Sequence, residues 1–145
     1  MPLFFTALLA QIYVGWGSAM SQCLQRQRIV KYLQEQYETQ PETLWPRYPN
    51  HSVFRHPASR KWYAIAMNIP QNKLGMEGER SVDILNVKCS PMMLGSLLCE
   101  KGFFPAYHMN KKSWISILLD ESVADETIFF LLEMSYDSTV PNRKT

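Results

Sequence analysis

The spacing of apolar and polar residues predicts three helices along the chain. In residues 21–38, apolar side chains recur at helical spacing and basic residues fall between them, a pattern typical of an amphipathic helix. A second helix is expected to begin after Ser90, because serine is a good N-cap and the proline that follows suits the first helical turn, and to end near residue 101. A third helix is predicted over residues 124–137, with Ser122 as its cap.

Alternating runs predict strands at residues 52–56, 61–69, 82–89, 105–108 and 114–119. Because strand side chains alternate between two faces, one set in the second strand is expected to face the core: Tyr63, Ile65, Met67 and Ile69. Trp62 then lies on the opposite face. In the last strand Ile115 and Ile117 face the core, whereas Trp114 lies opposite.

The predicted order is helix, three strands, helix, two strands, helix. Separate helices covering one face of a five-stranded antiparallel sheet define a two-layer α+β domain. At 145 residues the chain has the size of a single domain, which we place at residues 20–138, followed by a tail at 139–145. Met20 is followed at once by the first helical pattern, so residues 1–19 are interpreted as an N-terminal extension. Mass spectrometry of the protein expressed from its own gene would identify the true start.

Composition and charge narrow the class of protein. With 46% hydrophobic and 19% charged residues, the chain is expected to fold into a globular domain. The apolar run at residues 3–10 is shorter than the roughly 20 residues that span a bilayer, so no membrane association is expected. Cys23, Cys89 and Cys99 show no metal-ligand spacing and favour a reducing, cytoplasmic location. We expect a monomer without metal or cofactor.

No residue pattern indicates a reaction. We find no paired carboxylates, no cluster of histidines and cysteines at metal-ligand spacing, and no glycine-rich phosphate loop in the sequence. The protein is therefore predicted to be non-enzymatic. A net charge of +2 would not by itself steer it to nucleic acid, so only a clustered distribution of charge would do so.

Candidate binding residues lie on the sheet face away from the helices and at the tips of the two hairpins. The face is predicted to present Trp62 and Trp114 beside Lys88, and such aromatic rings can stack on bases while ammonium groups contact phosphates. The tips add further cations: Arg55, Arg60 and Lys61 from the first, Lys111 and Lys112 from the second. Two plainer interpretations stay open. In the first, the tryptophans pack against each other or under the proline-rich connector instead of binding a ligand. In the second, the lysines serve only to keep the turns hydrated.

Four segments resemble the MmcQ/YjbR family of small bacterial proteins. They read VDILNVKCSP at residues 82–91, PAYHMNKKSW at 105–114, LLD at 118–120 and MSYD at 134–137. The resemblance implies a secretion-chaperone-like α+β fold and a DNA-binding role through a double-wing motif. The positions that match the family motif, and to which it would assign binding, are Lys88, His108, Asn110, Lys111 and Trp114.

The leading hypothesis is a cytoplasmic, non-enzymatic protein that binds DNA or another nucleic acid. It would contact phosphates through the two basic hairpin tips and use Trp114, with Trp62, as a stacking platform. The alternative is a protein-interaction module, since the implied fold resembles chaperones that hold an extended segment of a partner.

Overall fold

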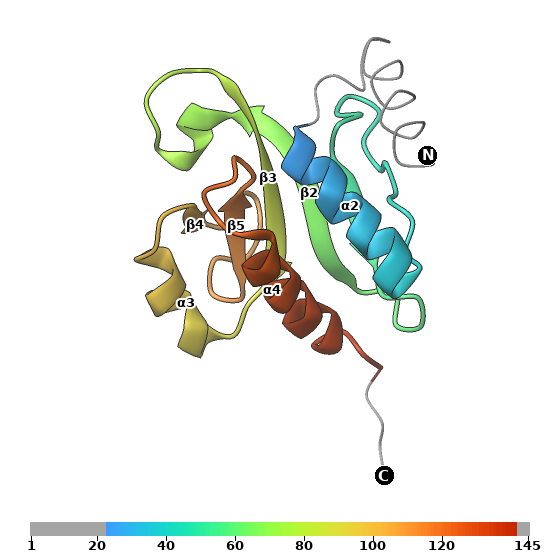
Figure 1. The fold of residues 1–145 in the computed structure, drawn as a ribbon. Helices are drawn as coiled ribbons and strands as arrows, with labels where there is room; N and C mark the ends of the chain where they lie inside the picture. Colours follow the sequence, from blue (N-terminus) through green and yellow to red (C-terminus); the bar gives the residue numbers. More distant parts are fainter. Residues whose placement is uncertain (1–22, 142–145) are drawn as a thin grey trace, which may run out of the picture.

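The computed structural model describes residues 23–141, and its elements follow the predicted order (Figure 1). They are α2 (Leu24–Tyr37), β1 (Ser52–Arg55), β2 (Trp62–Pro70), a short 3-10 helix η2 (Gln71–Leu74), β3 (Ser81–Lys88), α3 (Pro91–Leu98), β4 (Phe103–Pro105), β5 (Trp114–Leu118) and α4 (Asp125–Asp137). The predicted extension at residues 1–19 lies outside the described residues, as does the end of the predicted tail.

The strands form one antiparallel sheet in the order β1-β2-β3-β5-β4. Figure 1 shows α2 and α4 lying across the same face of this sheet. Side chains of all three helices join the sheet in one buried core, represented by Leu33 of α2, Leu94 of α3 and Leu132 of α4. The predicted two-layer α+β fold with helices on one face is confirmed.

A β-bulge at Tyr63 changes which residues of β2 face the helices. Phe54 of β1 pairs with Ala64, and Arg55 pairs with Trp62, so Tyr63 is an extra residue in the ladder. Such an insertion reverses the alternation beyond it. Tyr63 packs in the helix-covered core as predicted. The prediction for the other three residues of the set was wrong, because they face away from the helices: Ile65, Met67 and Ile69.

Loops cover the second face of the sheet and bury a second, smaller core there. This core contains Ile65 and Met67 of β2, Ile84 of β3, and Trp114 and Leu118 of β5. The connector between α2 and β1 contributes Trp45, and the loop between β4 and β5 contributes Ala106, Tyr107 and Met109. The face predicted to be uncovered is therefore largely closed by irregular chain.

The strand predicted at residues 105–108 is shorter and lies earlier. β4 ends at Pro105, after which side chains replace the ladder: the Tyr107 backbone N–H donates to Ser116 Oγ at 2.9 Å, and Asn86 Nδ2 donates to the Tyr107 carbonyl at 3.0 Å. These two bonds satisfy the Tyr107 backbone without a strand partner. They also turn the chain over the sheet, so residues 106–113 form a loop rather than a short tip.

Arg26, which helical spacing places on the polar side of α2, is fully buried and paired with Asp83 of β3 at 3.0 Å. Asp83 also accepts hydrogen bonds from Asn68 Nδ2 at 3.1 Å and from the Cys23 backbone N–H at 2.9 Å. Arg26 donates in addition to the Asn50 carbonyl. These bonds tie α2 to the sheet and to the connector, and they offset part of the cost of burying the ion pair. Within residues 23–141, Arg26 Nε is buried without a hydrogen-bond partner.

The helix boundaries agree with the predictions to within one residue except at three ends. α2 begins at Leu24, after its N-cap Cys23, rather than at residue 21. Ser90 is the N-cap of α3 and proline follows it, as expected, but the helix ends at Leu98 rather than near residue 101. The N-cap of α4 is Ala124, so the cap predicted at Ser122 was wrong. The Ser122 backbone N–H instead donates to Asp120 Oδ1 at 2.9 Å, which holds Ser122 in a turn two residues before the N-cap.

Candidate nucleic-acid interface

The cationic residues singled out in the sequence gather at one end of the sheet. Arg55 pairs with Trp62 where β1 ends and β2 begins, and Lys88 pairs with Trp114 where β3 ends and β5 begins. The turn at residues 56–61 and the loop at 106–113 leave the sheet at this same end (Figure 1). We call this region the basic end, and its cations are Arg55, Arg60, Lys61, Lys88, Lys111 and Lys112.

The first hairpin turn is built around His56, which is 7% exposed. The ring Nδ1 of His56 accepts a hydrogen bond from the Ala58 backbone N–H at 3.0 Å. The His56 backbone N–H donates to the Lys61 carbonyl at 2.8 Å. Arg60 has a positive φ of 63°, a conformation that a tight turn demands and that non-glycine residues seldom adopt. The turn is therefore fixed by specific contacts, and it leaves the Lys61 side chain exposed.

Glu42 of the connector neutralises part of the charge at this turn. One of its carboxylate oxygens, Oε2, lies 3.1 Å from Arg55 Nε and 3.2 Å from Arg60 NH2. Both pairs are partly exposed, so they are weak and can be exchanged for other anions. Within residues 23–141, Lys61, Lys111 and Lys112 form no ion pair within 4.0 Å.

In the second loop, the motif residue Asn110 has a structural role. Its Oδ1 accepts the Lys112 backbone N–H at 2.9 Å, and its carbonyl accepts the Trp114 N–H at 2.9 Å. These bonds close the turn that presents the exposed side chains of Lys111 and Lys112. His108 is also exposed, with a positive φ of 58° and its ring stacked on Tyr107 at 3.9 Å.

The two tryptophans predicted as stacking platforms differ in exposure. Trp114 is 7% exposed and lies in the second core, so the predicted exposure of its ring was wrong. The loop that begins at Ala106 joins it in that core, which the sequence pattern alone does not reveal. Trp62 is half-buried and meets Trp45 of the connector edge-on at 5.9 Å, which confirms for Trp62 the alternative of packing under that segment.

Sequence reasoning missed a pocket of about 260 Å³ on the loop-covered face. We call it the aromatic pocket. Its residues come from the connector, from β2 and from the second loop: Trp45, Tyr48, His51, Trp62, Ile65, Met67, Tyr107, His108 and Met109. The bulge at Tyr63 creates it, because the reversed alternation brings Ile65 and Met67 to the same face as Trp62. The aromatic residues of the connector were the only signal of it in the sequence.

His51 is an uncharged wall of the aromatic pocket at neutral pH. It is 8% exposed, and its ring stacks on Tyr48 at 5.0 Å. Burial lowers the pKa of His51 below its ordinary 6.5, and the charge of Arg26 adds to that effect, while the Asn50 backbone opposes it. His51 Nδ1 is buried without a hydrogen-bond partner in the part of the chain that the structure describes.

Acidic residues concentrate at the end of the sheet away from the basic end. Asp120 and Glu121 follow the last residue of β5, far along that strand from Trp114. Arg28 of α2 pairs with Glu121 at 2.6 Å and with Asp125 at 2.7 Å. The hydrogen bond from Arg28 holds the pKa of the Asp125 carboxyl below its usual value. Cations are present at this end as well, since Arg28 pairs with these carboxylates and Arg80 lines a pocket together with Asp120.

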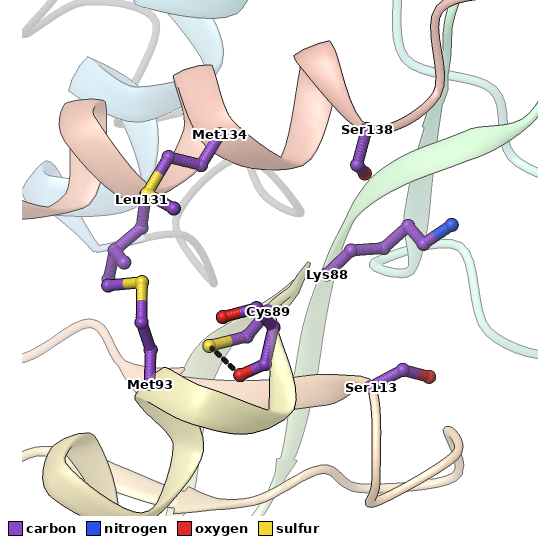
Figure 2. Close-up of a pocket in the computed structure, with 8 residues that line it drawn as sticks. Lys88, Cys89, Met93, Ser113, Leu131, Met134 and Ser138 are labelled. Atoms are coloured by element: carbon purple, nitrogen blue, oxygen red, sulfur yellow. Dashed lines mark hydrogen bonds between the residues drawn. The ribbon is translucent and has the colours of Figure 1, made fainter.

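A second pocket, of about 230 Å³, lies between α3, α4 and the end of β3. We call it the methionine pocket, and it is lined by Lys88, Cys89, Ser90, Met93, Ser113, Leu131, Met134 and Ser138. Figure 2 shows Met93 and Met134 near Leu131, whereas the Lys88 chain extends away from them. Burial raises the pKa of the Cys89 thiol, so this cysteine stays protonated and is a poor nucleophile at neutral pH.

Two further findings concern residues 23–141. No group of three or more histidine, cysteine, aspartate or glutamate side chains there is arranged to hold a metal ion. No helix in this range is long and apolar enough to cross a membrane.

Comparison with known proteins places the chain among close relatives. A family model described as YjbR matches residues 15–138. The uncharacterised protein YyaQ of Bacillus subtilis is 40% identical over 116 residues, which cover 80% of this chain and 98% of YyaQ. A crystal structure of a Pseudomonas syringae protein is 41% identical with a TM-score of 0.77, and the match covers 79% of this chain and 97% of that one. A Deinococcus radiodurans crystal structure, 21% identical, shares the fold with a TM-score of 0.59 over 80% of this chain and 81% of its own.

The architecture and these matches define a class of small two-layer α+β proteins built on a five-stranded antiparallel sheet. The chain belongs to the YjbR family, which confirms the resemblance seen in its motifs.

Proposed function

We propose that this protein is a non-enzymatic nucleic-acid-binding protein that contacts phosphates through its basic end. The observation that carries the proposal is the position of the two hairpin connections. Both leave the sheet at the same end, and both expose lysines that form no ion pair within residues 23–141. Separate tips that leave the sheet at one end can contact different phosphates of one strand.

The local distribution of charge supports this proposal better than the net charge of the chain does. A net charge of +2 is small, but the acidic residues near Glu121 and Asp125 lie at the far end of the sheet and are paired with Arg28. A phosphate chain that approaches the basic end therefore meets cations first. Lysine contacts of this kind are independent of sequence and depend steeply on salt. We infer binding without base-specific readout.

The proposal also places the protein in the reducing cytoplasm as a monomer. Cys23, Cys89 and Cys99 are all free thiols in the structure, and none pairs with another. Free cysteines are typical of proteins that work where disulfides do not persist.

The test is fluorescence anisotropy of the full chain with labelled single-stranded and double-stranded DNA over a salt series. We expect log affinity to fall linearly with log salt concentration. Changing both Lys111 and Lys112 to alanine should weaken binding on any sequence and reduce the slope by about two. The matched control is Lys31→Ala with Lys101→Ala, which removes the same charge from exposed positions on α2 and after α3. If the two double variants bind alike, the second loop does not contact phosphate.

A protein-interaction module is the second candidate, and the methionine pocket favours it. Met93 and Met134 line this apolar pocket, and Met92, which precedes Met93 on α3, is 92% exposed. Methionine-rich surfaces adapt to many apolar partners. A single stoichiometric protein recovered with the full chain, unaffected by nuclease and lost in Met93→Glu, would support this candidate. Retention of that protein by the Met93→Glu variant would count against it.

A further inference from the structure

We propose that the aromatic pocket takes one unpaired nucleobase of the bound strand, so that the ligand of this protein is single-stranded. This inference rests on the proposed function and names the kind of nucleic acid that the basic end would hold. It follows from the shape of the pocket, from the absence of charge on its buried walls and from its position beside the tips.

The shape of the pocket suits a flat ring. Its walls are aromatic: Trp45 meets Trp62 edge-on at 5.9 Å and 90°, and the Tyr107 and His108 rings are stacked at 3.9 Å. Its volume of about 260 Å³ lies just below the roughly 300–1,000 Å³ of sites for drug-sized ligands. One aromatic ring system of the size of a base fits such a space, and Met67 at the floor can adjust to it.

The interior of the pocket is uncharged, and a cation that is paired with Glu42 lies beside it. Ile65 and Met67 form the floor, and His51 is neutral at neutral pH because burial disfavours its charged form. The guanidinium of Arg55 lies 5.8 Å from the centre of the Trp62 ring. A nucleotide matches this arrangement, because its flat, uncharged base suits the interior and its anionic phosphate suits the neighbouring cation.

Residues of the aromatic pocket are close in sequence to the exposed lysines of both tips. Trp62 is both a wall of the pocket and the first residue of β2, directly after the exposed Lys61 of the first turn. On the other side, His108 and Met109 are followed within the same loop by Lys111 and Lys112. A strand held by the two tips therefore passes the mouth of the pocket. The bases of a duplex are paired and stacked and cannot enter it without being flipped out, at a cost of a few kcal/mol.

The first part of the experiment compares three DNA probes with the full chain at one salt concentration. They are a thymidine strand of about twelve nucleotides, an abasic strand of the same length, and a duplex of the same length, chosen within the usual range of single-strand site sizes. The first two carry the same phosphates. We expect the thymidine strand to bind about tenfold more tightly than the abasic strand, since one stacked base contributes about 1–3 kcal/mol. We also expect it to bind more tightly than the duplex.

The second part compares two alanine variants with equal loss of exposed aromatic surface. Tyr48, in the pocket, is 54% exposed, and Phe130, on α4, is 56% exposed, so neither change removes a buried side chain. Tyr48→Ala should weaken binding of the thymidine strand about fivefold or more and leave the abasic strand unaffected. Phe130→Ala should change neither. Tryptophan emission should also respond to the thymidine strand and not to the abasic one, because Trp45 and Trp62 line the pocket.

The outcomes separate the two proposals. Equal, salt-dependent binding of all three probes, with Tyr48→Ala unchanged, would overturn the base pocket and leave the phosphate contacts standing. No binding of any probe at low salt would overturn both. Binding of the thymidine strand that is weakened equally in Tyr48→Ala and Phe130→Ala would show that the loss is unspecific, and this also contradicts the inference.

Discussion

The two faces of the sheet are covered in different ways, and the difference separates stability from binding. On one face, the helices α2, α3 and α4 bury an apolar core, and the paired Arg26 and Asp83 are also buried on this face. On the other, irregular chain buries a smaller core, leaves the aromatic pocket open and carries the basic end. The helix-covered face also has a pocket, the methionine pocket between α3 and α4, but the aromatic pocket is bounded by loops that a few side-chain hydrogen bonds hold in place.

The loop-covered face depends on buried polar contacts to position its loops, whereas those of the helix-covered face, at Arg26 and Asp83, attach a helix to the sheet. Ser116 Oγ donates to Asn86 Oδ1, and this buried pair holds the Tyr107 backbone in place. A loop has no ladder of its own, so its buried backbone groups need such partners. The lesson is that the polar residues of this face position the loop, while the exposed residues of the same loop are available for a ligand.

The largest effect is expected on the helix-covered face, from Asp83→Ala. Removing this carboxylate leaves the guanidinium of Arg26 buried and unpaired, which should lower the free energy of unfolding by about 3–5 kcal/mol. Urea unfolding followed by circular dichroism measures the loss. Glu79→Ala removes an exposed carboxylate from the loop before β3 and should change stability by less than about 0.5 kcal/mol. Similar losses in both variants would mean that the pair does not tie α2 to the sheet.

A pair of core truncations compares the two faces directly. Leu132→Ala should cost about 3–4 kcal/mol, because Leu132 is fully buried between α4 and the sheet. Met67→Ala should cost nearer about 2 kcal/mol, since its side chain already borders the aromatic pocket and has fewer neighbours to lose. Urea midpoints at one pH measure both. An equal or larger cost for Met67→Ala would contradict the description of the second face as loosely closed.

A gain of affinity is expected from Glu42→Gln. This change frees Arg55 and Arg60 from their carboxylate partner and should tighten DNA binding by up to about fivefold, given the roughly 0.2–1 kcal/mol of an exposed ion pair. Glu121→Gln is the matched control, because it changes the net charge equally but frees Arg28 at the acidic end. Anisotropy at constant salt measures both. If Glu121→Gln gains as much as Glu42→Gln, the effect is one of total charge alone.

The smallest effect concerns pH and His51. The pKa of His51 in the folded protein lies below its ordinary value of 6.5. At a pH between the folded and the ordinary pKa, the unfolded chain therefore binds more protons than the folded chain. Stability should therefore be complete above pH 6.5 and decrease as the pH falls below it. Thermal unfolding between about pH 7.5 and 5 measures this trend, which should be reduced in His51→Phe. A stability that rises as the pH falls through this range would contradict the assigned direction.

The element order could be predicted from the sequence because it depends on local patterns. Periodicity located all three described helices and four of the five strands, and the start of α3 followed from Ser90 and its proline. The strand predicted at residues 105–108 overlaps β4 only at Pro105. The faces of β5 were also predicted correctly, since this strand contains no inserted residue. The predicted faces of β2 failed at Tyr63, because a bulge depends on pairing with β1 and leaves no mark in the alternation.

The candidate site was predicted only in part, because some of its contacts join segments that are distant in the sequence. The clustering of the basic tips follows from strand order, and both tips do lie at one end of the sheet. The burial of Trp114 and the pairing of Arg55 with Glu42 depend on segments distant in sequence that fold back over the sheet. The aromatic pocket needs both the bulge and the two covering loops, so no single stretch of sequence could reveal it.

The most direct test of the central claim is an NMR titration of the isotopically labelled full chain with a thymidine strand. We expect the chemical-shift changes of backbone amides to concentrate in residues 45–51, 56–62 and 106–113, on the loop-covered face and at the basic end. The amides of α3 and of the outer side of α4 should stay in place. Shifts centred on α3 and the methionine pocket, or no shifts at low salt, would contradict the claim.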